Sequence, residues 1–135
     1  MNHVKLFCLA MAVFFILDMT WIGFIAKGMY FKAYGNWLRL ENGSLLPVWW
    51  ATIIIYALFA FATLTFIVPL SHGSLLSAFA YGAALGLVIY GVYDFTCVAI
   101  FKDWPVMMAF VDWLWGTFLC GASATITVYV SRFID

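Results

Sequence analysis

The sequence predicts an all-α, polytopic membrane protein, a bundle of four transmembrane helices that forms one domain over residues 1–135. Hydrophobic residues make up 67% of the chain and charged residues only 9%, whereas ordinary soluble domains carry about 25% charged residues. Four stretches are mostly apolar and about as long as the roughly 17–25 residues that a helix needs to cross a bilayer. The net charge of zero argues against nucleic acid as a partner.

Proline-containing and polar breaks separate the four predicted spans. The spans cover approximately residues 4–26, 47–70, 74–101 and 105–131. Pro47 and Pro105 stand where proline is best tolerated, in the first turn of a helix. Because the number of spans is even, both termini are expected on one side of the membrane and the first and third loops on the other. Lys27, Lys32, Arg39 and Lys102 flank these two loops, so the positive-inside rule places the loops in the cytoplasm.

The first loop, residues 27–46, is the longest connection in the chain. Its residues Tyr30, Tyr34, Trp37 and Leu38 follow the i, i+4, i+7, i+8 spacing of one helix face. The spacing predicts a short amphipathic helix lying in the plane of the lipid headgroups. An irregular loop with aromatic anchors is the alternative interpretation.

Three carboxylates lie inside apolar stretches: Asp18 in the first span, Asp94 in the third and Asp112 in the fourth. An ionisable group in the hydrocarbon core costs about 2.5–3.5 kcal/mol on insertion scales, so each needs a local reason to be there. Each carboxylate is eight or nine residues from the loop side, which at 1.5 Å per residue is roughly 12–14 Å. We therefore expect the three acids to meet at one depth, together with Tyr56 of the second span.

Two tryptophans are spaced to share helix faces with these acids. Trp21 and Trp115 follow Asp18 and Asp112 by three residues, and their indole N–H groups are predicted to donate to the aspartates. We predict a polar, aromatic-walled pocket that opens toward the loop side. Its candidate ligand-binding residues are Asp18, Asp94, Asp112, Trp21, Trp115, Tyr56, Tyr90 and Thr96. The sequence carries no metal-binding histidine set and no cofactor motif, so we predict neither a metal nor a cofactor.

Several functions fit such a pocket. The first interpretation is binding or transport of a cation, a proton or an amphipathic small molecule. The second is a membrane-embedded enzyme in which one aspartate is a general acid or base, or an accessory subunit, acting in the modification of membrane lipids. The third gives the aspartates a structural role as interhelical hydrogen-bond acceptors. Gly82-x-x-x-Gly86 indicates close helix packing within the monomer, with a homodimer face as the alternative.

Four motifs together resemble a family of small four-helix bacterial inner-membrane proteins of unknown function. They are Leu17-Asp18-x-x-Trp21-Ile22-Gly23, Tyr93-Asp94-x-Thr96, Trp104-Pro105 and Asp112-x-x-Trp115-Gly116. The resemblance covers nearly the whole chain and implies four spans in a bacterial inner membrane, surrounded by membrane lipids. Cys97 departs from the asparagine that the family pattern has at this position. Members are often encoded near enzymes that modify membrane acyl chains, which points toward a lipid context.

Overall fold

The computed structural model describes residues 2–134, and four of its helical segments are long and apolar enough to cross a membrane. These segments are His3–Ile25, Trp49–Ser71, Leu75–Ile100 and Val106–Ser131. Each end lies within two residues of the predicted span. The predicted all-α fold with four membrane-spanning helices is therefore confirmed.

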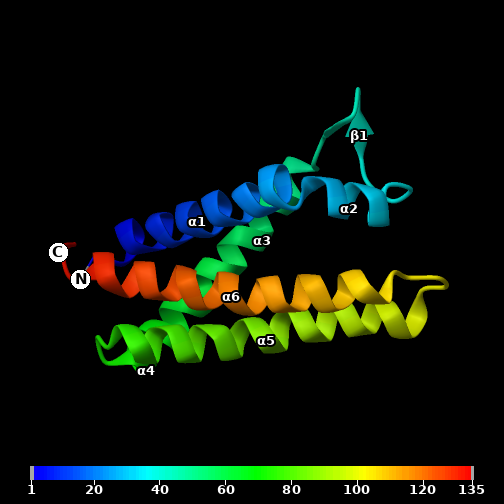
Figure 1. Cartoon of the computed structure of the whole chain (residues 1–135). Helices are drawn as coiled ribbons and strands as arrows, with labels where there is room; N and C mark the ends of the chain where they lie inside the picture. Colours follow the sequence, from blue (N-terminus) through cyan, green and yellow to red (C-terminus); the bar gives the residue numbers. More distant parts are fainter. Residues whose placement is uncertain (1, 135) are drawn as a thin grey trace.

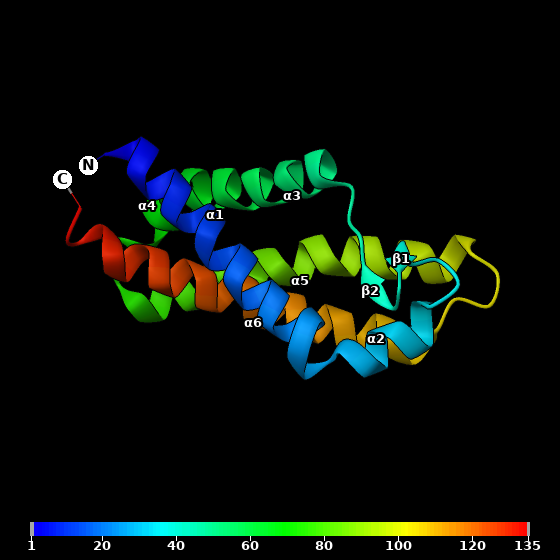
Figure 2. The same ribbon diagram turned by 90° about the horizontal axis from the view of Figure 1, so that it is seen from above.

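The helices pack as an antiparallel pair with two further helices on one side of it (Figure 1). Helices α5 (Leu75–Ile100) and α6 (Val106–Ser131) lie side by side along their whole length. Helix α1 (His3–Thr20) packs on α6 and also on α3 (Trp49–Ala62). Helix α3 rises away from α5 toward the loop end of the bundle (Figure 1), and seen from above α1 crosses α6 obliquely (Figure 2). The two termini lie together at the opposite end (Figure 1).

Glycine allows α5 and α6 to approach closely. A Cβ added to Gly82 would lie 2.6 Å from the carbonyl oxygen of Cys120, and one added to Gly86 would overlap the backbone of Gly116. Small residues at a helix interface let two backbones come together, which is how helices pack tightly in lipid. The Gly82-x-x-x-Gly86 motif thus serves packing within the chain.

Two of the spans contain a π-helical segment. In the second span, η2 (Thr63–Ile67) is followed by α4 (Val68–Ser71), and Val68 N–H donates to the carbonyl of Thr63. Pro69 lies in α4; it has no N–H, and its ring would clash with the carbonyl four residues earlier in a regular α-helix. The wider turn just before Pro69 accommodates both restrictions. The sequence did not predict this segment.

The other π-helical segment, η1 (Trp21–Ile25), directly follows the turn that holds Asp18. It ends at Ala26, whose φ of −108° and ψ of 11° break the helix, and α2 (Lys27–Tyr34) begins at the next residue. Such π-helical turns are rare in proteins and occur frequently at functional sites. The break redirects the chain so that α2 leaves the axis of the first span (Figure 1).

The first loop contains the predicted short helix, α2. Tyr30 in α2 is only 5% exposed and packs with Met108 of α6, so this face of α2 is turned into the protein. The break at Ala26 brings the phenol against the bundle, a contact that the sequence did not predict. The position of α2 in the plane of the lipid headgroups stays a prediction.

A β-hairpin follows α2, and sequence reasoning did not predict it. Strands β1 (Leu40–Glu41) and β2 (Ser44–Leu45) are antiparallel and are joined by Asn42 and Gly43. Both turn residues have positive φ, 53° and 79°. A two-residue Asn-Gly turn with this geometry is the type that favours tight hairpins, so the Asn-Gly pair was the signal for it.

Candidate functional site

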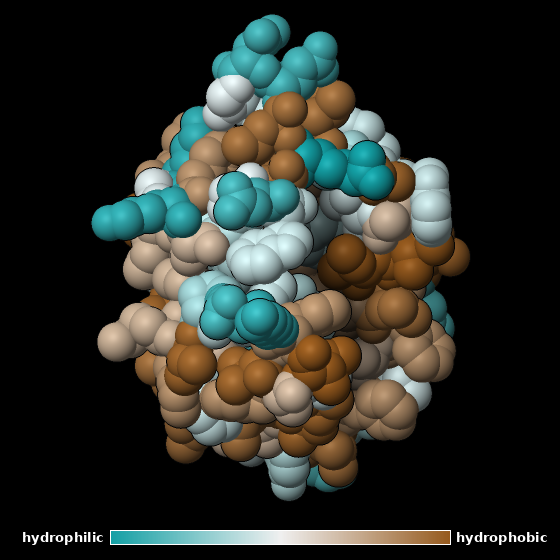
Figure 3. All heavy atoms as spheres, turned by 90° about the vertical axis from the view of Figure 1, so that its right-hand side faces the viewer, coloured by the Kyte–Doolittle hydropathy of each residue, from teal (hydrophilic) through white to brown (hydrophobic). Residues whose placement is uncertain are grey.

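A cavity of about 560 Å³ lies at the loop end of the bundle, between α1, α2, α3, α5 and α6. The side chains that line it are mostly aromatic and aliphatic, with two carboxylates, Asp18 and Asp112, among them. Five phenols also line it: Tyr30, Tyr34, Tyr56, Tyr90 and Tyr93. Seen from the loop end, the surface has a hollow with hydrophilic and pale, weakly polar side chains on one side and hydrophobic side chains on the other (Figure 3). The cavity wall is thus mostly apolar, and the charged residues that line it are both acidic.

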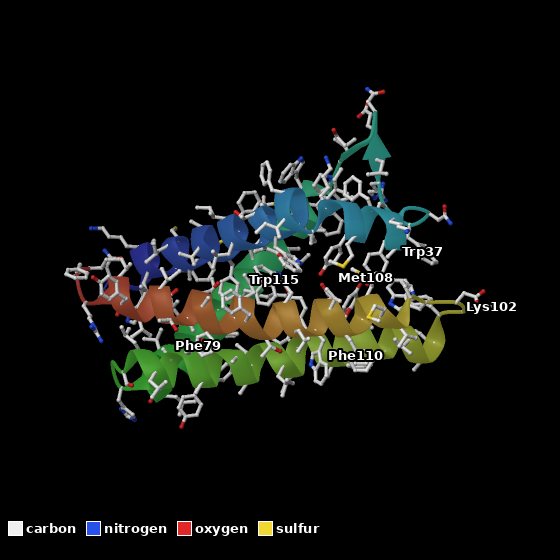
Figure 4. All side chains as sticks on the ribbon, viewed as in Figure 1. Trp37, Phe79, Lys102, Met108, Phe110 and Trp115 are labelled. Atoms are coloured by element: carbon white, nitrogen blue, oxygen red, sulfur yellow. The ribbon has the colours of Figure 1, made fainter. Side chains whose placement is uncertain are left out.

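Both carboxylate oxygens of Asp18 accept hydrogen bonds from other spans. Tyr56 of α3 donates its hydroxyl to Oδ2 at 2.7 Å, and Trp115 of α6 donates its indole N–H to Oδ1 at 3.0 Å. The predicted meeting of Asp18 and Tyr56 and the predicted donation by Trp115 are confirmed. In Figure 4, Trp115 projects from α6 toward α1. Hydrogen bonds to charged groups contribute roughly 1.5–3 kcal/mol each, so Asp18 ties three helices together.

Asp112 accepts its hydrogen bond from the first loop. The hydroxyl of Tyr30 donates to Oδ1 of Asp112 at 2.8 Å. The indole N–H of Trp21 donates to the Tyr30 oxygen at 3.1 Å. The prediction that Trp21 donates directly to an aspartate is therefore wrong: Tyr30 stands between Trp21 and the acid.

The two acid sites are joined by their tryptophans. The rings of Trp21 and Trp115 stack with centroids 4.6 Å apart and planes within 8° of parallel. One indole reaches Asp18 directly and the other reaches Asp112 through Tyr30. Offset stacked rings contribute roughly 0.5–1.5 kcal/mol beyond their buried area, so the stacking holds Trp21 and Trp115 against each other between the two acids.

The break at Ala26 makes the Tyr30 contact available. On a continuous helix, residues nine apart, such as Trp21 and Tyr30, are separated by about 13.5 Å along the axis. The turn between η1 and α2 shortens this separation, so that the Tyr30 hydroxyl meets the Trp21 indole and Asp112 together. Burial, and then the nearby Asp112 carboxylate, raise the pKa of Tyr30 well above its ordinary value. Its phenol therefore remains a hydrogen-bond donor at physiological pH.

Asp94 is placed differently from the other two acids. Asp94, a residue of α5, is fully buried and does not line the cavity. Its charged neighbour is Asp112, close enough for the two carboxyl groups to interact. Neither oxygen of Asp94 has a hydrogen-bond partner in the part of the chain that the structure describes. Asp112 is therefore near both other acids: Asp94 is its neighbour, and the charge of Asp18, which lines the same cavity, acts on it.

The remaining predicted residues divide between the cavity and the outer surface. Tyr90 lines the cavity, and its ring packs directly on Gly116 of α6, where any Cβ would overlap it. Thr96 lies on the exposed face of α5 and does not line the cavity. The glycine of the Asp112-x-x-Trp115-Gly116 motif therefore makes room for an aromatic side chain of the cavity wall.

Sequence reasoning did not assign the aromatic residues that cover the loop end of the cavity. Trp104, from the turn between α5 and α6, packs on Tyr34 and Trp37 at centroid distances of 5.2 and 5.1 Å. Burial, and then the charge of Asp112, raise the pKa of Tyr34 above its ordinary value. The four-residue spacing of Tyr30 and Tyr34 signalled one aromatic face, but not that this face would close a cavity.

Replacing Tyr56 by phenylalanine tests the contribution of the Asp18 contacts to the fold. We expect Tyr56→Phe to lower the free energy of unfolding by about 1.5–3 kcal/mol, because it removes a hydrogen bond to the half-buried carboxylate of Asp18. Equilibrium unfolding in mixed micelles measures this. Tyr81→Phe is the matched control, since Tyr81 is an exposed tyrosine of α5 outside the cavity. Equal stabilities of the two variants would contradict the expectation.

Comparison with known proteins supports the membrane assignment. A family model described as "Predicted membrane protein (DUF2177)" matches residues 3–129 of the chain. No curated protein and no solved structure matches it. The match agrees with the resemblance that the four sequence motifs indicated, and it covers all four membrane-spanning segments almost completely.

Proposed function

We propose that this chain, which belongs to the family of predicted membrane proteins described as DUF2177, is a membrane-embedded binding protein. Its cavity would take an amphipathic cation. The observation that carries this proposal is the charge of the cavity. Its wall contains the carboxylates of Asp18 and Asp112, and the residues that line it in the described chain include no lysine, arginine or histidine. A positively charged ligand would supply the missing counter-charge.

The hydrogen bonds around Asp18 support a charged rather than a neutral role. An ionised carboxylate only accepts hydrogen bonds, and both oxygens of Asp18 accept one. An unpaired charge in a low-dielectric site is costly, so such groups are generally paired. Lys27, the basic residue nearest to α1 in sequence on the loop side, lies instead over the ring of Phe31 at 5.3 Å. A ligand cation is therefore the natural partner for the Asp18 carboxylate.

The aromatic wall suits a cationic group as well. Tyrosine and tryptophan faces attract ammonium groups by about 0.5–2 kcal/mol each, and aromatic cages recognise quaternary ammonium ligands in this way. Tyr30, Tyr90 and Trp104 line the cavity together with the acids. Its volume, about 560 Å³, falls within the roughly 300–1,000 Å³ that is usual for small-molecule sites.

The side of the cavity between α3 and α5 suits the apolar part of the ligand. Ile55 of α3 and Ile89 of α5 line the cavity and are 50% and 36% exposed. Helix α3 rises away from α5 toward this end of the bundle (Figure 1). Because both isoleucines are exposed, a hydrocarbon chain can extend past them from the cavity into the surrounding lipid. The ligand class is thus an amine or quaternary ammonium group that carries an alkyl chain.

Binding of a matched pair of amphiphiles tests the proposal. In lipid nanodiscs, dodecyltrimethylammonium should produce a saturable change in tryptophan fluorescence, because Trp37, Trp49 and Trp104 line the cavity. We expect it to bind at least about tenfold more tightly than its uncharged carbon isostere, a difference of about 1.4 kcal/mol. Equal affinities for the charged and uncharged compounds would overturn the proposal, because hydrophobic partition alone would then explain binding.

A further inference from the structure

The position of Asp94 requires an explanation that the cavity does not give. Its exposed fraction is 0%, and both of its oxygens are buried without a hydrogen-bond partner among residues 2–134. A buried polar group without a partner costs several times the net contribution of a typical hydrogen bond. The carboxyl group of Asp112 lies beside it, yet two ionised carboxylates are both acceptors and repel each other.

One proton removes both difficulties. A protonated carboxyl has an O–H donor, so a protonated Asp94 can donate a hydrogen bond to the Asp112 carboxylate. The proton also halves the negative charge of the pair, and carboxyl groups that share a site titrate as a unit in this way. We propose that Asp94 and Asp112 form a proton-binding site, an acid–carboxylate pair that holds one proton between α5 and α6.

The groups that face the pair are consistent with one bound proton. Tyr34 of α2 and Tyr93 of α5 are near enough to Asp94 for its charge to act on their phenols. Tyr30 donates to Oδ1 of Asp112, and the carboxylate of Asp18, in the same cavity, adds negative charge. These neighbours are phenols and a further acid, and the structure shows no salt bridge to either member of the pair within the described residues. A proton is thus the cation that the buried pair itself can hold.

The pair also touches the cavity, because Asp112 belongs to both. A cation in the cavity would stabilise the charged form of Asp112 and so favour release of the proton from the pair. This consequence rests on the proposed function, whereas the proton site itself needs no ligand. The two can therefore be tested separately.

Infrared spectroscopy of the ligand-free protein in lipid vesicles tests the proton site. At neutral pH the wild-type protein should show the carbonyl stretch of a protonated carboxylic acid, and Asp94→Asn should lose it. The asparagine amide can still donate to Asp112 as the protonated acid would, so this variant should fold. Asp103→Asn, in the exposed turn between α5 and α6, is the matched control and should retain the band. Absence of the band in the wild-type protein, or its persistence in Asp94→Asn, would overturn the proposal.

A second measurement does not depend on the spectrum. Thermal stability of the wild-type protein should fall as the pH is raised above neutrality, because the folded pair holds a proton that separated carboxyl groups of the unfolded chain have already released. Asp94→Asn should lack this loss. With the dodecyltrimethylammonium probe, wild-type binding should also tighten with rising pH and Asp94→Asn binding should not. If only the binding did not change with pH, the proton site would not be coupled to the cavity. If the thermal stability of the wild-type protein did not fall with rising pH, the proton site itself would be overturned.

Discussion

Replacing both cavity carboxylates, with Asp18→Asn and Asp112→Asn together, is expected to weaken binding of dodecyltrimethylammonium at least about a hundredfold, or about 2.8 kcal/mol. The reason is that these two groups supply the negative charge of the cavity wall. Asparagine keeps the size of each side chain, and its carbonyl oxygen can accept from Tyr30 at position 112 and from Trp115 at position 18. At position 18 the amide NH2 then faces Tyr56, whose hydroxyl can accept as well as donate. The measurement is tryptophan fluorescence titration in nanodiscs.

Two controls separate the loss of charge from general damage. Asp103→Asn removes a carboxylate from the exposed turn between α5 and α6, outside the cavity lining. Asp103 has a φ of 58°, a backbone conformation that asparagine tolerates well, so binding should not change. The uncharged isostere should bind the double variant and the wild-type protein equally. If the double variant bound the ammonium compound as tightly as the wild-type protein, the cavity carboxylates would not be the cation contacts.

The spans and the depth of the acids could be predicted because they depend on local sequence. Hydropathy and helix length determine where a helix can cross a membrane, and the rise per residue then converts position into depth. This arithmetic placed Asp18 and Tyr56 at one level, where they form a 2.7 Å hydrogen bond. The spacing of Asp112 and Trp115 likewise indicated a shared helix face, and Trp115 reaches Asp18 from it.

The contacts that were missed depend on where the chain bends or on which face a helix presents. Tyr30 reaches Asp112 only because η1 and the break at Ala26 redirect the first loop, and hydropathy carries no signal for a π-helical turn. Trp21 consequently donates to Tyr30 instead of an acid. Thr96 shares the Asp-x-Thr spacing of Asp18 and Thr20, but residues two apart on a helix do not face the same way. Its exposed position follows from that geometry.

The glycine at position 116 gives the second large expected effect. In Gly116→Ala, the new Cβ would overlap the ring of Tyr90, which packs on this part of α6. Overpacking in a well-packed interior typically costs 1–3 kcal/mol, and here the ring must also move within the cavity that it lines. We expect a loss of about that size in mixed-micelle unfolding, together with weaker binding of dodecyltrimethylammonium.

A double-mutant cycle with Tyr90→Ala shows whether this clash is the cause. Without the ring, Gly116→Ala should cost almost nothing, and it could even stabilise the helix, since alanine is favoured over glycine in helices by about 1 kcal/mol. Gly23→Ala provides the matched control because an added Cβ there has no neighbour within 4 Å. If Gly116→Ala costs the same with and without the Tyr90 ring, the clash is not with that ring. Its cost would then arise at the α5–α6 backbone contact, where Gly86 meets Gly116.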